Sequence, residues 1–415
     1  MSFKEEILSC VEQDREKIIN FCAELVRCNT SSSHGDTRSA ANLIKNFLDA
    51  EGIEYQEISA CKTMPNIIST TEMSKSGKSL MLNGHLDVMP AGNEPGWSVD
   101  PYSGIIKDGK IIGRGTSDMK AGITAMLFAY KYLQKFKSDL SGKLSLTLVS
   151  DGETGWGRGT GFLFKKIPEQ MKVDCVLTGE PSGIDAISFS SKGYIQITVK
   201  VATRGAISGY SNESKSAIEI AADLIRDLKK LENFQVEIPK DLQDFLNNEG
   251  YKESHEKVRG KEHLEQLQKV TVDICTIKGG SLFSVIAADC KFTAAIVIPL
   301  GTNVDLLISK LISIAAEYSE AELIIDGVDL PEMSPPSSEL TKILSDTVVE
   351  LGKSRPVLTP DIAISDCRYW RYLGIPAYWY GLGGELCSAA DEFVTIEDLI
   401  HVTKVHALTV LKYLS

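Results

Sequence analysis

The sequence predicts an α/β fold that is interrupted by a smaller α+β segment. Apolar, strand-like runs alternate with amphipathic helical stretches up to about residue 190, and the same alternation returns after residue 329. Between these parts the pattern changes to four strands and two long helices. Polar residues directly follow several of the predicted strands, which is where open α/β sheets bind ligands. We therefore expect one domain formed by residues 1–190 and 329–415, with a second domain, residues 191–328, inserted into it.

The composition argues against several classes of function. With 415 residues the chain can form two domains, each with its own core. Its net charge of −12 argues against a nucleic acid or an anionic membrane as partner, so we expect a small-molecule substrate. No apolar stretch is long enough to span a bilayer, and the first residues do not resemble a signal peptide. The nine scattered cysteines form no C-x-x-C pair, which favours a reducing cytoplasm over a disulfide framework.

Hydrophobic periodicity places the elements of the first part. Helices are predicted where apolar residues recur every three or four positions, and strands where short apolar runs are bounded by polar residues. A long loop separates the second predicted strand from a short segment that ends in Gly113-Arg114-Gly115. The predicted helices are 3–27, 37–51 and 120–136, and the predicted strands are 66–70, 79–83, 144–150 and 174–177.

The inserted part is predicted as strands that pack against helices. It contains a very polar segment, 234–268, whose His255 and His263 we expect at the surface rather than in a metal site. The last helix of the chain carries His401 and His406, but their spacing of five does not place two ligands on one helix face. The predicted strands of this part are 195–201, 270–277, 290–298 and 322–326, and its predicted helices are 214–231 and 304–318. In the α/β part that follows, the predicted helices are 340–351 and 396–413.

Histidine and acidic side chains follow the strand ends of the first part. His85 and Asp87 are two residues apart at the end of one strand, so they point the same way and Asp87 can orient the His85 ring. Asp118 follows the glycine-rich segment, and its carboxylate could bridge two metal ions. One imidazole with several carboxylates suits zinc, cobalt or manganese. The five residues are His85, Asp87, Asp118, Glu153 and Glu180.

These residues stand in an order that resembles a known family. The sequence is similar to the dizinc amidohydrolases and exopeptidases that include acetylornithine deacetylase, succinyl-diaminopimelate desuccinylase, aminoacylase and carboxypeptidase G. The resemblance extends over nearly the whole chain. It implies an α/β, mixed-sheet, metallopeptidase-like catalytic domain with an inserted α+β lid and dimerisation domain. The motifs that carry it are Gly84-His85-Leu86-Asp87-Val88, Trp97 with Asp100-Pro101, Gly113 to Gly122, Thr178-Gly179-Glu180-Pro181, Ser191-Lys192-Gly193, Ile277-Lys278-Gly279-Gly280, Ser365-Asp366-Cys367-Arg368 and Gly374-Ile375-Pro376.

The resemblance implies a set of metal ligands. His85, Asp118 and Glu180 would bind one zinc ion, which gives that metal a complete set of ligands. Asp118 would also bridge to a second zinc ion beside Glu153.

Further roles follow from the same resemblance. Asp87 would orient the His85 ring, and the Asp118-Met119 peptide bond would be cis. Arg368 lies in a matching motif and is a candidate catalytic residue. The inserted domain would form the lid and could join two copies of the chain into a homodimer.

The family's general base is absent at its expected position. The family has Asp-Glu-Glu where this chain has Asp151-Gly152-Glu153, and the first of those glutamates takes a proton from water. Loss of a general base typically lowers a rate about 10²–10⁴-fold. Asp151 is a candidate replacement base.

The second metal position also lacks a ligand. Ser388 stands where the family has a histidine, so only Asp118 and Glu153 remain for a second metal ion. Cys387 or Glu385 offers a replacement ligand near that position. Three polar groups of the family's lid are absent as well, where this chain has Gly209, Ser284 and Ile296.

Three hypotheses about function follow. The first is a zinc-dependent amidohydrolase or deacylase that acts on N-acyl amino acids or small peptides through a remodelled active site. The second is a metal-dependent enzyme on the same scaffold that does not hydrolyse its substrate, such as a lyase, an isomerase or an acyl transferase. The third is a binding homologue without catalytic activity.

Overall fold

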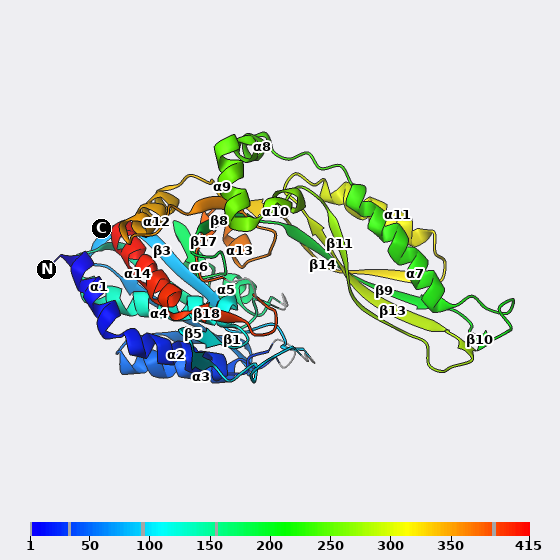
Figure 1. The fold of residues 1–415 in the computed structure, drawn as a ribbon, viewed down its shortest axis with the longest axis horizontal. Helices are drawn as coiled ribbons and strands as arrows, with labels where there is room; N and C mark the ends of the chain where they lie inside the picture. The colour runs from blue at the N-terminus through cyan, green and yellow to red at the C-terminus, as the bar shows by residue number, and fades with distance from the viewer. Residues whose placement is uncertain (1, 32–34, 93–95, 154–156, 384–386) are drawn as a thin grey trace. The chain divides into compact units, whose positions relative to one another are not determined.

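The computed structural model describes residues 2–31, 35–92, 96–153, 157–383 and 387–415. The chain divides into two compact units, drawn in Figure 1. Unit 1 comprises residues 1–189, 334–359 and 365–415, and unit 2 comprises residues 190–333 and 360–364. The predicted α/β class with an inserted α+β part is confirmed.

Most of the elements predicted in unit 1 begin and end within a few residues of their predicted bounds, and the structure adds short elements that the sequence does not predict. The last helix, 396–413, has its predicted bounds, whereas the first predicted helix is two helices that meet at Asp14. The helices are α1 (Phe3–Gln13), α2 (Arg15–Arg27), α3 (Arg38–Ala50), α4 (Ala121–Leu133), α5 (Thr160–Lys166), α6 (Pro168–Met171), α12 (Glu339–Glu350), α13 (Cys367–Arg371) and α14 (Ile396–Tyr413), with short helical turns η1 (Thr116–Lys120) and η2 (Gln134–Phe136).

The main sheet combines parallel and antiparallel strands. Its order is β1-β2-β6-β3-β7-β17-β8-β15, and β16 also pairs with β8. The central strands β6, β3, β7 and β17 run parallel, so their carboxyl ends lie at one edge. A separate small sheet has the order β18-β5-β4. The strands are β1 (Gln56–Cys61), β2 (Met64–Glu72), β3 (Lys75–His85), β4 (Ile105–Lys107), β5 (Lys110–Ile112), β6 (Ser141–Val149), β7 (Cys175–Thr178), β8 (Ala186–Ser191), β15 (Glu332–Met333), β16 (Val357–Pro360), β17 (Ala377–Trp379) and β18 (Phe393–Thr395).

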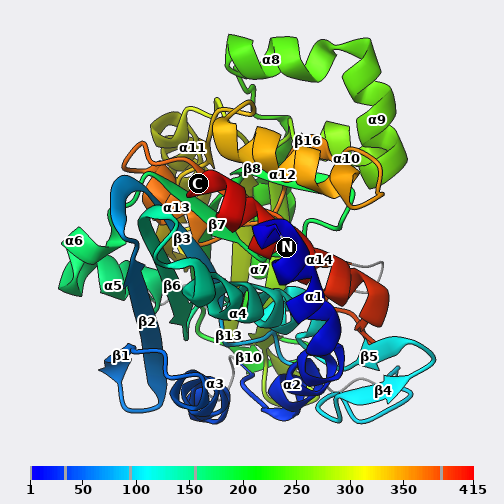
Figure 2. The ribbon, with the colours of Figure 1, turned by 90° about the vertical axis from the view of Figure 1, so that its left-hand side faces the viewer.

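Helices cover both faces of this sheet. Figure 2 shows α1, α4 and α14 grouped on one side, and α4 packs against β3, β6 and α14. On the other side Trp370 of α13, Leu163 of α5 and Met171 of α6 pack over Met81 of β3 and Val176 of β7. Because both faces are covered, both faces of the central strands are buried: in β6 the small polar residues Ser145 and Thr147, which alternate with leucines, are as buried as those leucines.

Unit 2 consists of an antiparallel sheet with helices on one face. The sheet has the order β11-β13-β9-β14, and α7 and α11 pack against it around buried residues such as Ile197, Leu224, Phe292 and Leu311. A two-stranded sheet pairs β10 with β12. The elements are β9 (Gly193–Ala202), β10 (Ala206–Ile207), α7 (Ala217–Leu228), η3 (Lys229–Asn233), α8 (Lys240–Asn247), α9 (Glu249–Arg259), α10 (Lys261–Gln266), β11 (Thr271–Gly279), β12 (Val285–Ile286), β13 (Asp289–Ile298), α11 (Val304–Ala316) and β14 (Ala321–Asp329).

The expectation that His255 lies at the surface is wrong. The polar segment folds into α8, α9 and α10, and His255 is fully buried among them. Its Nδ1 lies 2.8 Å from the Tyr251 hydroxyl and its Nε2 lies 3.1 Å from Nδ1 of His263. The two imidazoles thus satisfy these polar atoms through hydrogen bonds, and the expectation that they are not metal ligands remains a prediction.

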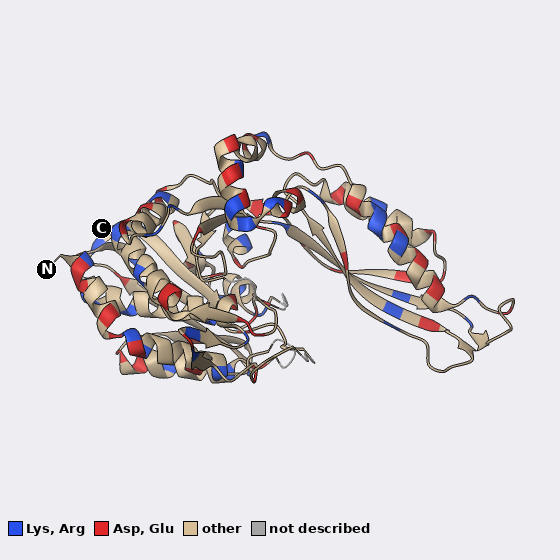
Figure 3. Cartoon of the chain, in the orientation of Figure 1, with Lys and Arg blue, Asp and Glu red and all other residues tan. Residues whose placement is uncertain are grey.

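The surface charges are mixed rather than segregated. Figure 3 shows acidic and basic residues interspersed along the helices, in keeping with a net charge spread over the whole chain. Among the described residues no helix is both long and apolar enough to cross a bilayer. The cytoplasmic location indicated by the cysteines remains a prediction.

Candidate metal centre

Parallel strand ends bring the predicted site residues together. β3 ends at His85, β6 ends just before the loop of Asp151, and β7 ends just before Glu180. Because β3 pairs in parallel with both β6 and β7, these ends meet at the same edge of the sheet. Asp118 comes from the helical turn η1, which packs against β3 and α4. The strand ends and η1 thus supply one cluster within unit 1.

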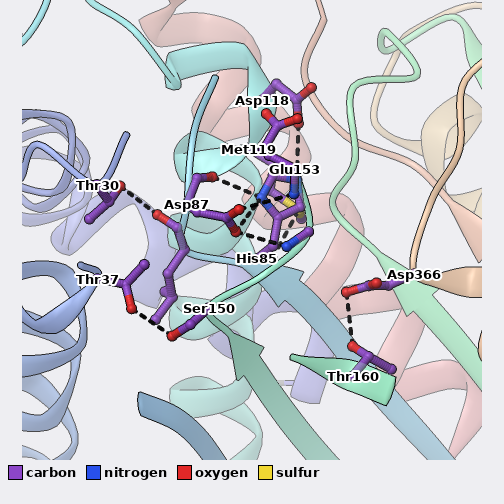
Figure 4. Close-up of polar contacts among 12 residues, drawn as sticks. Thr30, Thr37, His85, Asp87, Asp118, Met119, Ser150, Glu153, Thr160 and Asp366 are labelled. Carbon is purple, nitrogen blue, oxygen red and sulfur yellow. Dashed lines mark hydrogen bonds and ion pairs between the residues drawn. The ribbon is translucent and has the colours of Figure 1, made fainter. Parts of the chain in front are cut away.

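Three of the predicted ligands face one point. Nε2 of His85 lies 3.2 Å from Oδ1 of Asp118 and 3.6 Å from Oε2 of Glu180, and the ligand atoms of the three residues lie within 4.8 Å of one another. Ligands about 2.1 Å from a tetrahedral metal ion are separated by about 3.4 Å. The spacing therefore fits a shared metal ion. Figure 4 shows His85 and Asp118 in this arrangement.

Buried carboxylate oxygens of the cluster are poorly compensated. Among the described residues, Oε1 of Glu153 is buried and accepts no hydrogen bond, and Oδ1 of Asp118 is buried against Nε2 of His85. Such atoms are costly to bury unless a cation or another donor compensates them. The chemistry of the donor set, one imidazole and several carboxylates, also suits a metal ion.

The carboxylates create a strongly negative potential at this point. Burial opposes a charge on the His85 ring, yet the carboxylates of Glu180 and Asp118 raise the pKa of His85 well above its usual value. Burial and then the charge of Asp118 raise the pKa of Glu153 well above its usual range, and burial raises the pKa of Glu180 to about 7. These carboxyl groups destabilise one another's charged forms, and a bound cation would remove that penalty.

Asp87 holds the His85 ring through its backbone more closely than through its side chain. Nδ1 of His85 lies 2.9 Å from the carbonyl oxygen of Asp87 and 3.6 Å from its carboxylate. The carboxylate instead accepts the backbone N–H groups of Gly152 at 2.8 Å and Glu153 at 3.0 Å. Because the Asp87 carbonyl is next to Nδ1, Nε2 is the ring nitrogen of His85 that faces Asp118 and Glu180.

Gly152 lies directly against the His85 ring. A Cβ atom at position 152 would lie 2.3 Å from Cγ of His85 and 2.5 Å from both its Cβ and Cδ2. These separations are far below van der Waals contact, so only glycine fits this backbone. The missing general base is thus matched by a loop that leaves no room for any side chain at its position.

The other two catalytic candidates are buried beside the cluster but have partners of their own. Oδ2 of Asp151 accepts the backbone N–H of Arg158 at 2.7 Å. Nη1 of Arg368 donates to the carbonyl of Ser365 at 3.1 Å, and its guanidinium carbon lies 4.6 Å from the centre of the Tyr369 ring. Their predicted catalytic roles remain predictions.

Asp366 is a buried carboxylate that is not among the predicted site residues. Its Oδ2 accepts the Thr160 hydroxyl at 2.8 Å, whereas its Oδ1 accepts no hydrogen bond from the described residues. Burial raises its pKa, and Arg368 and His85 oppose that rise. Its position within the Ser365–Arg368 motif is the signal that points to it.

Glu392 is a second buried acid outside the predicted set. It is fully buried and accepts hydrogen bonds from the backbone that carries Asp118. Burial raises its pKa, while its backbone and Arg114 donors oppose that rise. The signal in the sequence is the pair Asp391-Glu392, which resembles an acidic pair near the C-terminus of the family.

The described residues provide no preformed second metal position. Neither Glu153 nor Cys387 belongs to a group of ligand atoms as close as that of His85, Asp118 and Glu180. Cys387 is partly buried, and burial followed by the charges of Asp118, Glu392 and Glu153 raises the pKa of its thiol. Ser388 is exposed, and Glu385 lies outside the described residues.

Comparison with known proteins agrees with this geometry. Residues 81–412 match the model of peptidase family M20/M25/M40. Succinyl-diaminopimelate desuccinylase 2 of Ruegeria sp. is 25% identical over 397 residues, which cover 92% of this chain and 91% of that protein. A pyrimidine deformylase of Halalkalibacterium halodurans (N-formyl-4-amino-5-aminomethyl-2-methylpyrimidine deformylase) is 32% identical over 158 residues, 37% of each chain.

Solved structures share the fold at low sequence identity. A family M20 metallo-carboxypeptidase from Sulfolobus solfataricus has a TM-score of 0.81 at 17% identity, covering 95% of this chain and 99% of that one. A di-peptidase of Saccharomyces cerevisiae has a TM-score of 0.82 at 14% identity, covering 100% of this chain and 99% of that one.

The Asp118-Met119 peptide bond is cis, which confirms the expectation drawn from the family resemblance. From its sequence match, the protein belongs to peptidase family M20/M25/M40 and is an enzyme of the metal-dependent amidohydrolase type.

Proposed function

We propose that the protein hydrolyses the amide bond of a small N-acyl amino acid or peptide at a centre that holds one zinc ion. His85, Asp118 and Glu180 are the proposed ligands. The observation that carries the proposal is the convergence of their ligand atoms within 4.8 Å of one another. A second metal ion has no comparable group of ligands among the described residues.

The proton acceptor in this proposal is Glu153. A zinc ion at these ligands supplies Lewis acidity toward a carbonyl group and toward water. Glu153 is next to the vacant base position, and its buried Oε1 accepts no hydrogen bond from the described part of the chain. Burial raises the pKa of the Glu153 carboxyl group, and a buried carboxylate of raised basicity is suited to accept a proton from water and to return it to the leaving amine.

The relatives support an N-acyl or peptide substrate. The relatives include a desuccinylase and a deformylase, and the similar solved structures include a carboxypeptidase and a di-peptidase. All four names describe cleavage of a carbon–nitrogen bond of an acyl group. Buried Arg368, at the start of α13, is the proposed residue for contact with an anionic part of the substrate.

A second candidate is a metal-dependent enzyme that does not hydrolyse its substrate. The close approach of Gly152 to His85 favours it, because no side chain can replace the family's general base at that position. Under this proposal a metal ion held by His85, Asp118 and Glu180 would supply Lewis acidity toward a carbonyl group, either for an isomerisation or for transfer of an acyl group to a second substrate.

We further propose that unit 2 joins two copies of the chain. Large apolar side chains of unit 2 are exposed, with Ile207 at 67%, Leu282 at 74% and Phe283 at 97%. Exposed apolar clusters of this kind are typical of interaction sites. Light scattering after size-exclusion chromatography would show a dimer for the wild type and a monomer for a Leu282→Ser/Phe283→Ser variant. A wild-type monomer would reject this proposal.

One set of assays tests the catalytic proposal. The purified protein is supplied with zinc, cobalt or manganese and incubated with N-acyl amino acids and dipeptides, and free amine is measured. We expect hydrolysis by the wild type, loss of hydrolysis with retained metal in Glu153→Gln, and wild-type rates in Glu169→Gln, a matched change at an exposed carboxylate of α6. If metal is bound but no substrate of the panel is hydrolysed, the non-hydrolytic candidate is favoured.

A further inference from the structure

We propose that Glu392 is a positioning residue of the metal centre, because its carboxylate fixes the backbone segment that presents Asp118. This inference rests on the proposed metal centre. It concerns a residue that touches neither the proposed metal ion nor the substrate.

The Glu392 carboxylate accepts four hydrogen bonds from one short segment. Oε1 accepts the backbone N–H of Ser117 at 2.7 Å and that of Asp118 at 3.3 Å. Oε2 accepts the backbone N–H of Gly115 at 3.1 Å and Nη1 of Arg114 at 2.8 Å. Both oxygen atoms are therefore used by residues that directly precede or include the proposed ligand.

The backbone of Glu392 holds the same segment. Its carbonyl oxygen accepts the N–H of Gly113 at 2.8 Å, and Phe393, the next residue, pairs with Ile112 between strands β18 and β5. The carboxylate is fully buried, so its four donors replace the water that it would otherwise bind. A segment that turns around a buried anion in this way has its conformation set by that anion.

Helical hydrogen bonds hold only the end of the segment, where the Lys120 N–H donates to the Gly115 carbonyl. The N–H groups of Ser117 and Asp118 donate to Glu392 instead. Asp118 has φ −123° and ψ 94°, which are not helical values, and Gly115 has φ 85°, in the left-handed region. The bond from the Asp118 N–H to Glu392 is one of the contacts that fix this conformation. Asp118 in turn places its Oδ1 3.2 Å from Nε2 of His85. Removal of the Glu392 charge thus releases the segment that carries a metal ligand.

Metal affinity separates this role from general stabilisation. Zinc affinity is measured by competition with a chromophoric chelator for the wild type, Glu392→Gln and Glu392→Ala, at a temperature where circular dichroism shows folded metal-free protein. Loss of a residue that orients a metal ligand typically lowers affinity about 10–100-fold. We expect a drop in this range for Glu392→Gln and a larger drop for Glu392→Ala.

A matched control is available in the same unit. Asp14 accepts Nζ of Lys131 at 2.9 Å and is mostly buried, but it lies on other elements. Asp14→Asn should lower the melting temperature without a change in zinc affinity. If Glu392→Gln is folded and binds zinc within twofold of the wild type, the positioning role is wrong.

Hydrogen exchange tests the inference without a metal ion or a variant. In the metal-free wild type, the amide protons of Ser117 and Asp118 should exchange as slowly as those of the adjoining α4. Rapid exchange at both positions would overturn the proposal even if every Glu392 variant failed to fold. A wild type that binds no zinc but protects these amides would reject the metal centre and leave the hold of Glu392 on the segment supported.

Discussion

A methyl group added at Gly152 should disturb the proposed metal centre. The Cβ of Gly152→Ala would lie 2.3–2.5 Å from three atoms of His85. Neither partner can move freely, because the N–H groups of Gly152 and Glu153 are bonded to Asp87, and the Asp87 carbonyl lies 2.9 Å from Nδ1 of His85. Overpacking of this kind costs about 1–3 kcal/mol. Displacement of the ring from its ligand position should also lower zinc affinity about tenfold or more.

Two measurements check this prediction against one control. Thermal unfolding of the metal-free protein reports the lost stability, and chelator competition reports the zinc affinity. Gly327→Ala is the matched control, since a Cβ there has no heavy atom within 4 Å, and it should leave both values unchanged. Wild-type zinc affinity in Gly152→Ala would refute the close approach of Gly152 to His85. The same contact predicts that Gly152→Glu alone does not restore the family's general base.

Three further predictions concern the base, the second metal position and the pH dependence of stability. Glu153→Gln should lower the turnover number about 10²–10⁴-fold while the protein retains its zinc, as measured by product formation and metal analysis; an unchanged turnover would exclude Glu153 as proton acceptor. Cys387→Ser should bind as much zinc as the wild type, and a lower metal content would identify the thiol as a ligand. His406 is fully buried, with Nε2 2.7 Å from the carbonyl of Tyr380, and burial lowers its pKa to about 4. Because the unfolded state binds the proton more tightly, stability is complete above the ordinary pKa of about 6.5 and is lost as the pH falls toward 4. When the pH is lowered from about 7 to about 5, the free energy of unfolding of the wild type should therefore fall by about 2 kcal/mol more than that of His406→Gln, as measured by urea titrations. Equal falls in the two proteins would contradict a buried neutral imidazole.

The sequence predicts the parts of the site that depend on strand ends. His85 and Glu180 follow apolar strands, and the parallel pairing of these strands brings their ends together. Ligand binding at this edge of the sheet is a general property of α/β folds. The last helix also has its predicted bounds, because its apolar periodicity is long and uninterrupted. Such features depend on local pattern and on topology.

Other features depend on distances that no local pattern contains. Gly152 looks like the loss of a catalytic group, and only the structure shows that His85 lies where a side chain would be. His255 lies in a segment rich in charges, so its burial by its own helices is not visible in the composition. Ile296, which stands where the family's lid has a polar group, lies in the core of unit 2. Successive residues of its strand point to opposite faces, so a shift of one residue in the alignment changes the face on which that polar group would lie.

The metal content of the purified protein tests the central claim most directly. Plasma mass spectrometry of the wild type and of His85→Ala, each loaded with zinc and freed of excess metal by gel filtration, measures zinc per folded chain. We predict about one zinc ion per chain for the wild type and none for His85→Ala. A wild type that retains no metal, or two ions per chain that persist in His85→Ala, would contradict a single-metal centre at His85, Asp118 and Glu180.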